Sequence, residues 1–243
     1  MAEVKKQGRR SAEDAEKTRR HILNVAKDLF CEFGYSRVSL RNISEKAGIS
    51  HSLIRHHFGS KEQIWASIND ALHQNMISYS KVVLNNLSPE LKINERIYQF
   101  SVRILAFLLS RPQPIKLMAD VIREEGDMFD YFMDKSGLLE KTIIGMVDEY
   151  NQRTQSDIEL AEIKWQTIMY AHSAASMRPF MQQTWAKQTC SYEECLLLHW
   201  SMFNDMLTHK LNVASTAKLQ PTRLDQLIYH DDLPCANFSQ VSD

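Results

Sequence analysis

The sequence is poor in the residues that interrupt helices. Its 243 residues include only 7 Gly and 6 Pro, and no Pro occurs before Pro89. Pro lacks a backbone donor and Gly has high conformational freedom, so both residues mark the ends of helices. We also find no segment whose pattern indicates a β-strand. The sequence therefore predicts an all-α protein.

Two further absences limit where the protein works. The four cysteines have neither the paired spacing of metal ligands nor the pattern of a disulfide framework; they are Cys31, Cys190, Cys195 and Cys235. The longest apolar run, residues 104–109, is too short to cross a bilayer, and the first residues are polar rather than apolar. We expect a cytoplasmic protein with no bound metal, no cofactor and no membrane partner.

Motifs of catalysis are lacking as well. The chain has no Gly-rich phosphate loop, no nucleophile elbow, and no Cys or His pair at ligand spacing around an acidic residue. Isolated candidates such as Asp70 and His73 fit ordinary positions on a helix surface. We therefore expect no catalytic residues and no enzymatic activity.

The net charge of −1 conceals an uneven distribution. Residues 1–61 hold 13 Lys or Arg and 7 Asp or Glu, a net charge of +6, whereas the remainder carries −7. An apolar content of 44% excludes a disordered chain, and the length suits a small domain followed by a larger one. The positive N-terminal part is the part expected to meet nucleic acid.

One segment, residues 39–61, has the pattern of a helix-turn-helix. Ser39 and Ser50 are N-cap residues in front of two short helices, and Gly48 between them suits a left-handed turn. The first helix buries Leu40 and Ile43, and Ile49 anchors the turn. The second has an apolar side and a polar side; the apolar side is formed by Leu53, Ile54 and Phe58. A pair of helices that merely packs would show the same pattern.

The flanking sequence favours a complete domain. Apolar residues recur at helical spacing upstream, and Gly34 ends that helix; these residues are Ile22, Leu23, Ala26, Leu29, Phe30 and Phe33. A three-helix domain results.

With these flanks, residues 18–65 resemble the DNA-binding domain of the tetracycline-repressor (TetR) family of bacterial transcriptional regulators. The matching elements are Thr18-Arg-Arg-His-Ile-Leu-Asn-Val-Ala with Leu29-Phe30 and Phe33-Gly34-Tyr35, Val38-Ser39-Leu40 with Ile43, Ala47-Gly48-Ile49-Ser50, and His56-His57-Phe58-Gly59-Ser60-Lys61-Glu62. Arg55 stands where the family usually has an aromatic residue. The resemblance implies a DNA-binding head followed by a larger helical domain for ligand binding and dimerisation.

We divide the chain accordingly into a flexible basic arm (1–10), the helix-turn-helix domain (11–60), a helical regulatory and dimerisation domain (61–212) and a C-terminal tail (213–243). The arm either enters the minor groove or is only solvated. Helical patterns are expected at residues 61–86, 93–110, 114–124, 127–152, 158–186 and 191–212. Pro179 either kinks its helix or ends it near Met177.

In the resembling family the last two long helices of each subunit form a four-helix dimer interface, which maps here onto residues 158–212. Apolar and small residues on both segments are compatible with this, although packing inside one subunit explains them equally well. A homodimer would place two recognition helices one turn of DNA apart and so select a palindromic operator.

Nine residues are the candidates for contact with double-stranded DNA. His51, Ser52, Arg55 and His56 lie on the polar side of the second helix and are assigned to base edges, where Arg55 can bond guanine with two hydrogen bonds. Phosphate contacts are assigned to Ser39, Arg41, Ser50, His57 and Lys61. For His57 the alternative is a ring packed under its helix, and for Lys61 it is simple solvation.

The resemblance also implies a cavity for a small-molecule effector, although no local motif marks it. Aromatic, Met-rich helices suit apolar ligands, while packing in the core is the alternative for each residue. The candidates are Phe100, Arg103, Ile104, Phe107, Met118, Phe129, Phe132, Trp165, Met169, Tyr170 and His172.

Two functions are therefore in view. The first is a sequence-specific transcriptional regulator, expected to be a repressor, that binds a palindromic operator as a homodimer and responds to a small molecule. The second is a structural DNA-binding or protein-docking factor with the same DNA-binding head and no metabolite effector. A sealed apolar cavity would favour the first.

Overall fold

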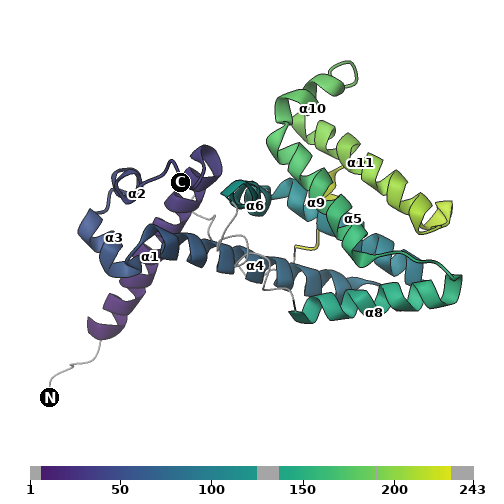
Figure 1. The fold of residues 1–243 in the computed structure, drawn as a ribbon, viewed down its shortest axis with the longest axis horizontal. Helices are drawn as coiled ribbons and strands as arrows, with labels where there is room; N and C mark the ends of the chain where they lie inside the picture. Colours follow the sequence, from purple (N-terminus) through teal and green to yellow (C-terminus); the bar gives the residue numbers. More distant parts are fainter. Residues whose placement is uncertain (1–6, 125–136, 190, 231–243) are drawn as a thin grey trace. The chain divides into compact units, whose positions relative to one another are not determined.

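A computed structural model describes residues 7–124, 137–189 and 191–230 of the chain (Figure 1). Over these ranges the chain forms α-helices and short 3-10 turns and contains no strand, which confirms the expected all-α class. The described residues divide into two compact units, the first ending at Gln74 and the second beginning at Asn75. None of the helices over these ranges is long and apolar enough to span a bilayer.

The first unit contains helices α1 (Gln7–Phe33), α2 (Leu40–Ala47), α3 (His51–Phe58) and the first half of α4 (Lys61–Asn86). Its core consists of buried apolar side chains from all four helices, because each helix is too short or too polar to be stable without an apolar contact face. These side chains are Ile22, Leu23, Ala26, Phe30, Ile43, Ile54, Phe58, Ile64, Trp65 and Ile68.

The ends of the short helices follow the local sequence. The Ser39 hydroxyl accepts a hydrogen bond from the Asn42 amide, and the Asn42 side chain bonds the Ser39 amide in return. Ser50 caps α3 in the same manner through the Leu53 amide. Gly48 has φ 66° and ψ 27°, the left-handed conformation that a residue with a Cβ adopts only at a cost. The predicted caps and turn are confirmed.

The second unit contains the rest of α4 together with α5 (Ile93–Ser110), α6 (Gln113–Glu124), α8 (Gly137–Thr154), α9 (Leu160–Ser176), α10 (Arg178–Thr184) and α11 (Tyr192–Lys210). Helix α5 is the central element, because it packs against α8, α9 and α11. Its side chains are buried along most of its length. The indole N–H of Trp200 on α11 donates a hydrogen bond of 2.8 Å to the backbone carbonyl of Val102 on α5.

Several element boundaries differ from the sequence prediction. Helix α1 begins at Gln7, inside the predicted arm, while residues 1–6 lie outside the described residues. The pattern at 127–152 corresponds to α8, which ends at Thr154 and whose expected first part also lies outside them. The pattern at 158–186 is two helices: α9 ends at Ser176, and Pro179 sits in the first turn of α10. Of the two alternatives for Pro179, the helix end is correct.

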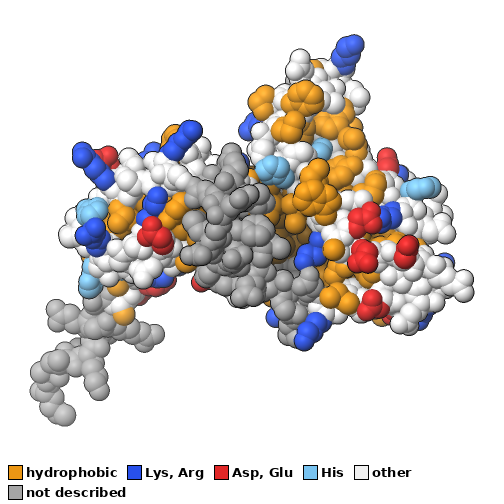
Figure 2. Space-filling model, viewed as in Figure 1, with side chains coloured by type: hydrophobic (Ala, Val, Ile, Leu, Met, Phe, Trp, Pro, Cys, Tyr) orange, Lys and Arg blue, Asp and Glu red, His pale blue; other side chains and the backbone are white. Residues whose placement is uncertain are grey.

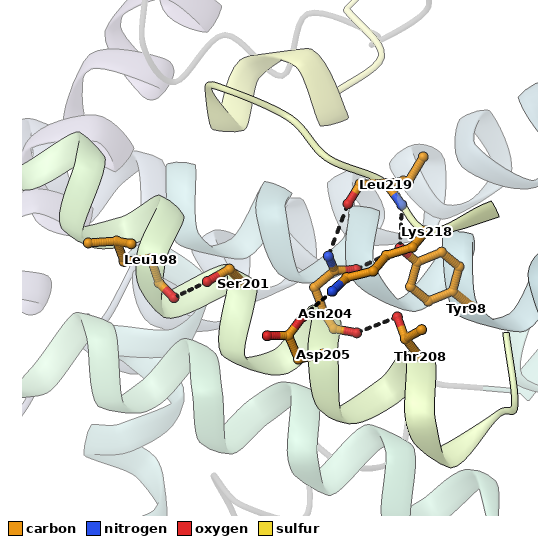
Figure 3. A network of polar contacts seen from close by, with 8 residues as sticks. All are labelled: Tyr98, Leu198, Ser201, Asn204, Asp205, Thr208, Lys218 and Leu219. Carbon is orange, nitrogen blue, oxygen red and sulfur yellow. Dashed lines mark hydrogen bonds and ion pairs between the residues drawn. The ribbon is translucent and has the colours of Figure 1, made fainter. Parts of the chain in front are cut away.

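The segment after α11 was predicted only as a tail, and its first part packs on the second unit. We call residues 213–230 the strap. It contains 3-10 turns at Ser215–Ala217 and Leu224–Leu227, and Val213 and Leu227 are buried in the core. Figure 3 shows its main anchor. The Tyr98 hydroxyl donates to Asn204 Oδ1 at 2.6 Å and accepts from the Leu219 amide at 2.7 Å.

Candidate nucleic-acid interface

Helix α3 presents a polar face that none of the described residues of the first unit covers. His51, Ser52, Arg55 and His56 are all exposed, while Ile54 and Phe58 on the other side are buried. The helix carries no carboxylate. An eight-residue helix held by two buried side chains therefore displays donors and a cation in a form that fits the major groove of DNA.

The structure differs from the sequence prediction at Leu53. This residue was assigned to the apolar side of α3, yet its side chain is 40% exposed. Adjacent positions on a helix point about 100° apart, and on α3 only the side that carries Ile54 and Phe58 is covered by the core. The side chain of Ile54 is buried in the core, and that of Leu53 lies at the edge of the polar face.

The predicted phosphate contacts at the two caps are exposed but already engaged. Ser39 and Ser50 lie at the N-termini of α2 and α3, where backbone N–H groups and the helix dipole favour an anion. Their hydroxyls accept the capping bonds, and Ser50 also bonds Ser52 at 3.1 Å. A phosphate at either cap would therefore bind mainly to the backbone N–H groups at the helix N-terminus, and the serine hydroxyl would contribute less.

Arg41 projects from α2 with 82% of its side chain exposed. It forms an ion pair with Glu45 one turn along the helix, at 2.8 Å, and the hydrogen bond to Glu45 raises the pKa of Arg41 above its usual value. Exposed pairs of this kind contribute little to stability. A phosphate therefore competes with only one weakly held carboxylate for this guanidinium.

Two of the nine candidates are half-buried. The ring of His57 lies edge-on to that of His56 and near that of Phe58, with centroid distances of 5.7 and 6.4 Å. The Lys61 ammonium lies 4.0 Å from the centre of the Tyr35 ring and donates to the Tyr35 carbonyl at 3.1 Å. The half-buried ring of His57 agrees with its packing alternative, whereas Lys61 contacts Tyr35 and is not simply solvated.

The turn between α1 and α2 is tied to the start of α4 by a second contact. The Tyr35 hydroxyl donates to Glu62 Oε1 at 3.0 Å. Hydrogen bonds from its own backbone amide and from Ser60 lower the pKa of Glu62, and the Tyr35 bond acts in the same direction. The carboxylate is therefore charged and held close to the Lys61 position at the helix start.

Arg19 on α1 is a residue that the sequence prediction missed. Its guanidinium donates to the carbonyl of His57 at 3.4 Å and to the Ser67 hydroxyl at 3.3 Å. It also covers the ring of Phe58, 4.4 Å from the centroid. Arg19 thus joins α1 to the end of α3 and the start of α4. It belongs to the matched Thr18-Arg-Arg-His motif, but its partners are 38 or more residues away.

The effector candidates do not form one group. Phe100, Ile104 and Phe107 on α5 belong to or pack on one apolar cluster, which we call the α4/α5 cluster; its buried members are Tyr79, Val83, Leu87, Phe100 and Phe107. Arg103 lies at the edge of this cluster and bonds the strap at Leu227. Met118 on α6 is buried in the main core. Phe129 and Phe132 lie outside the described residues.

The four candidates on α9 lie elsewhere. Trp165 is 61% exposed and Met169 48% exposed. Tyr170 is half-buried against Phe203 and His199 at the contact with α11, with both ring centroids 5.2 Å away. His172 faces Ser176 on the same helix at 3.5 Å. Trp165 and Met169 thus lie on a surface rather than in the core.

Comparison with known proteins identifies a family that matches the helix-turn-helix region of the chain. The family described as bacterial regulatory proteins, tetR family, matches residues 22–68. The HTH-type transcriptional regulator TtgR of Pseudomonas putida is 35% identical over 66 residues, which are 27% of this chain and 31% of TtgR. The regulator AcrR of Shigella flexneri is 35% identical over 68 residues, 28% of this chain and 32% of AcrR. These alignments span about a third of each relative.

Solved structures resemble the chain over a longer stretch. The fatty acid degradation regulator FadR of Bacillus halodurans matches with a TM-score of 0.52 at 12% identity, over 82% of this chain and 96% of that one. The transcriptional regulator PfmR of Thermus thermophilus matches with a TM-score of 0.50 at 17% identity, over 77% and 97%. At such identities the likeness shows a shared fold.

Proposed function

Because the chain belongs to the TetR family of bacterial regulatory proteins, we propose that it regulates transcription by binding double-stranded DNA in a sequence-specific way through α3. The observation that carries this proposal is the exposed face of His51, Ser52, Arg55 and His56, held in place by buried residues of the same helix. Arg55 can read guanine, and the N-termini of α2 and α3 suit the flanking phosphates.

We further propose that the active form is a homodimer assembled through residues 158–212. Within one subunit, α9 and α11 bury part of their apolar side chains against each other and α5, including Ile163, Ala171 and Phe203. Others remain exposed on the same helices, namely Trp165, Met169 and Met202. Figure 2 shows apolar side chains gathered on the visible face of the second unit. Large exposed apolar residues of this kind mark interaction surfaces.

A homodimer would explain why a palindromic operator is expected. Two recognition helices about 34–36 Å apart meet successive major grooves on one side of the duplex, so a palindrome satisfies both subunits. Repression follows if the operator overlaps a promoter. Within this proposal a small-molecule effector acts through α4, which contains residues of both units. The effector changes DNA affinity only as far as it prefers one arrangement of the recognition helices.

The decisive experiment is selection of bound sequences from a random duplex pool with the purified full chain at a stated salt concentration. Recovery of a palindrome with two half-sites supports the proposal. The Arg55→Ala variant should lose about 1–3 kcal/mol of specific binding and relax the preference at one base pair of each half-site. Arg153→Ala on α8, far along the chain from α3, is the control. No enrichment by the wild-type chain would contradict specific binding.

A further inference from the structure

The α4/α5 cluster has a polar end at which two buried donors, one on Tyr79 and one on Arg103, have no acceptor among the described residues. Tyr79 on α4 is fully buried, and its ring stacks on that of Phe107 on α5 at a centroid distance of 3.9 Å. Among the described residues, no acceptor is found for the proton of the Tyr79 hydroxyl, although the Tyr229 backbone amide lies near that oxygen, and the buried Nε–H group of Arg103 has no acceptor either. Buried donors are almost always satisfied in folded proteins, so two such groups on adjacent helices call for an explanation.

The same end of the cluster carries positive charge. Arg103 and Arg111 are both close enough to Tyr79 to act on its hydroxyl, and the Arg111 guanidinium lies 4.8 Å from the centre of the Phe107 ring. Across the part of the chain that the structure describes, no carboxylate pairs with either arginine. Burial raises the pKa of Tyr79 to about 12 against the opposing effects of the Tyr229 backbone amide and of both arginines, so the hydroxyl stays protonated and can donate.

Residues 227–229, the end of the strap, contact the polar end of the cluster. The Leu227 carbonyl accepts a hydrogen bond of 2.8 Å from Arg103, and the Tyr229 ring lies 4.6 Å from the centre of the same guanidinium. Ile228 and Tyr229 pack on the apolar residues of the cluster. Arg103 thus already contacts an oxygen acceptor and a planar aromatic ring, although this acceptor carries no charge.

We propose that Arg103 and Tyr79 form a binding site for a carboxylate on an apolar body, and that this ligand enters by displacing residues 227–229 of the strap. A carboxylate accepts from an arginine with two oxygens, and a bond between two charged groups is stronger than the bond from the same guanidinium to the neutral Leu227 carbonyl. The apolar body would replace the side chains of Ile228 and Tyr229 on the cluster. That this carboxylate is the effector rests on the proposed function.

The upstream part of the strap is held independently of its end, although displacement of that end also has to expose Leu227, whose side chain is buried in the core. The upstream part is fixed through Leu219, which bonds the Tyr98 hydroxyl and the side chain of Asn204, and through the ion pair of Lys218 with Asp205 (Figure 3). Seven residues separate Leu219 from the contacts of Leu227 and Tyr229 with Arg103. Displacement of that end uncovers Tyr79 and Val83 of α4, the helix that continues into the first unit.

Binding is tested with the full chain in the absence of DNA, so that the outcome does not depend on the regulatory function. The probes are octanoate and 4-phenylbutyrate, and the controls are their primary amides, which keep the apolar body and lack the charge. Calorimetric titration should show binding of at least one acid and tenfold or weaker binding of its amide. Arg103→Gln and Tyr79→Phe should each reduce the affinity for that acid, whereas the exposed Arg153→Gln should not.

The strap gives a second measurement that a purely structural role would not produce. Tyr229→Ala removes the ring that competes for the Arg103 guanidinium, so the acid should bind about two- to fivefold more tightly to this variant. Hydrogen exchange of residues 227–229 should increase when the acid is added. The proposal is wrong if neither acid binds the wild-type chain, if acid and amide bind equally, or if Tyr229→Ala weakens binding. An acid that binds without changing the affinity for a selected palindrome supports the site and counts against effector control.

Discussion

The Lys61 ammonium is held by both the ring and the backbone carbonyl of Tyr35. Tyr35 follows α1 and Lys61 begins α4, so one side chain fixes the turn after α1 against the start of the connecting helix. A cation at a helix start also lies beside free N–H groups that attract an anion. Lys61 therefore combines a packing role with a position suited to a phosphate of DNA.

Substitution of Lys61 should separate these two roles. Lys61→Ala should weaken binding to specific and random DNA alike, and the slope of log K against log salt concentration should fall by about 0.9. Loss of the cation–π contact should cost about 0.5–1 kcal/mol of stability. Binding isotherms at several salt concentrations provide the test, with the exposed Lys81→Ala on the same helix as control. An unchanged salt slope would show that Lys61 has a packing role and does not contact a phosphate.

Arg19 should act on DNA binding without touching DNA. Arg19→Ala removes the contacts to His57, Ser67 and Phe58, so the end of α3 loses its link to α1. We expect faster hydrogen exchange of the α3 amides and a lower affinity for the selected palindrome. The neighbouring exposed Arg20→Ala is the matched control for exchange. Equal exchange in α3 for both variants would show that Arg19 does not position the helix.

The proposed dimer surface makes a prediction about assembly. Trp165→Glu and Met202→Glu each put a charge on an exposed apolar position of α9 or α11, and a buried charge without a partner is costly. Sedimentation should show monomers where the wild-type chain forms dimers, and binding to a palindrome should weaken accordingly. Ile144→Glu on α8, another exposed apolar residue that lies outside the proposed interface, should leave the dimer intact. Dimers in all three variants would place the interface elsewhere.

His199 on α11 should make the second unit sensitive to acid. Burial lowers the pKa of His199 from its ordinary 6.5, although the hydrogen bond to the Tyr170 carbonyl opposes this. The unfolded chain then binds the proton more readily, so the stability contributed by the neutral ring is present above pH 6.5 and lost as the pH falls below it. The Tm of wild-type protein should fall with acid more steeply than that of His199→Asn. His209→Asn, at an exposed position of the same helix, should follow the wild-type curve.

The parts of the fold that the sequence predicted are those determined by neighbouring residues. The caps at Ser39 and Ser50, the turn at Gly48 and the limits of α5 depend on residues within one or two helical turns. Helix periodicity also placed Ile43, Ile54 and Phe58 in the core. For the same reason the exposure of His51, Ser52, Arg55 and His56 on α3 could be predicted, although that of Leu53 could not.

The remaining features depend on contacts between distant residues. The strap has no helical period, and its bonds to Tyr98 and Arg103 join residues more than a hundred positions apart. The role of Arg19 likewise appears only when α1, α3 and α4 are brought together. For Pro179, periodicity allowed both a kink and a helix end, since the decision lies in how α9 and α10 pack.

The exposure of Leu53 has a consequence for the DNA sequence that the protein prefers. Leu53 lies one turn from His56 on the same side of α3, and its apolar side chain cannot donate or accept a hydrogen bond; the one apolar group that a base pair offers in the major groove is the 5-methyl group of thymine. Each half-site should therefore contain a thymine next to the base pair contacted by His56, and its replacement by uracil, which lacks only the methyl group, should weaken binding of the wild-type chain but not of Leu53→Ala. The exposed side chain of Leu53 would then distinguish A·T from G·C base pairs without forming a polar contact.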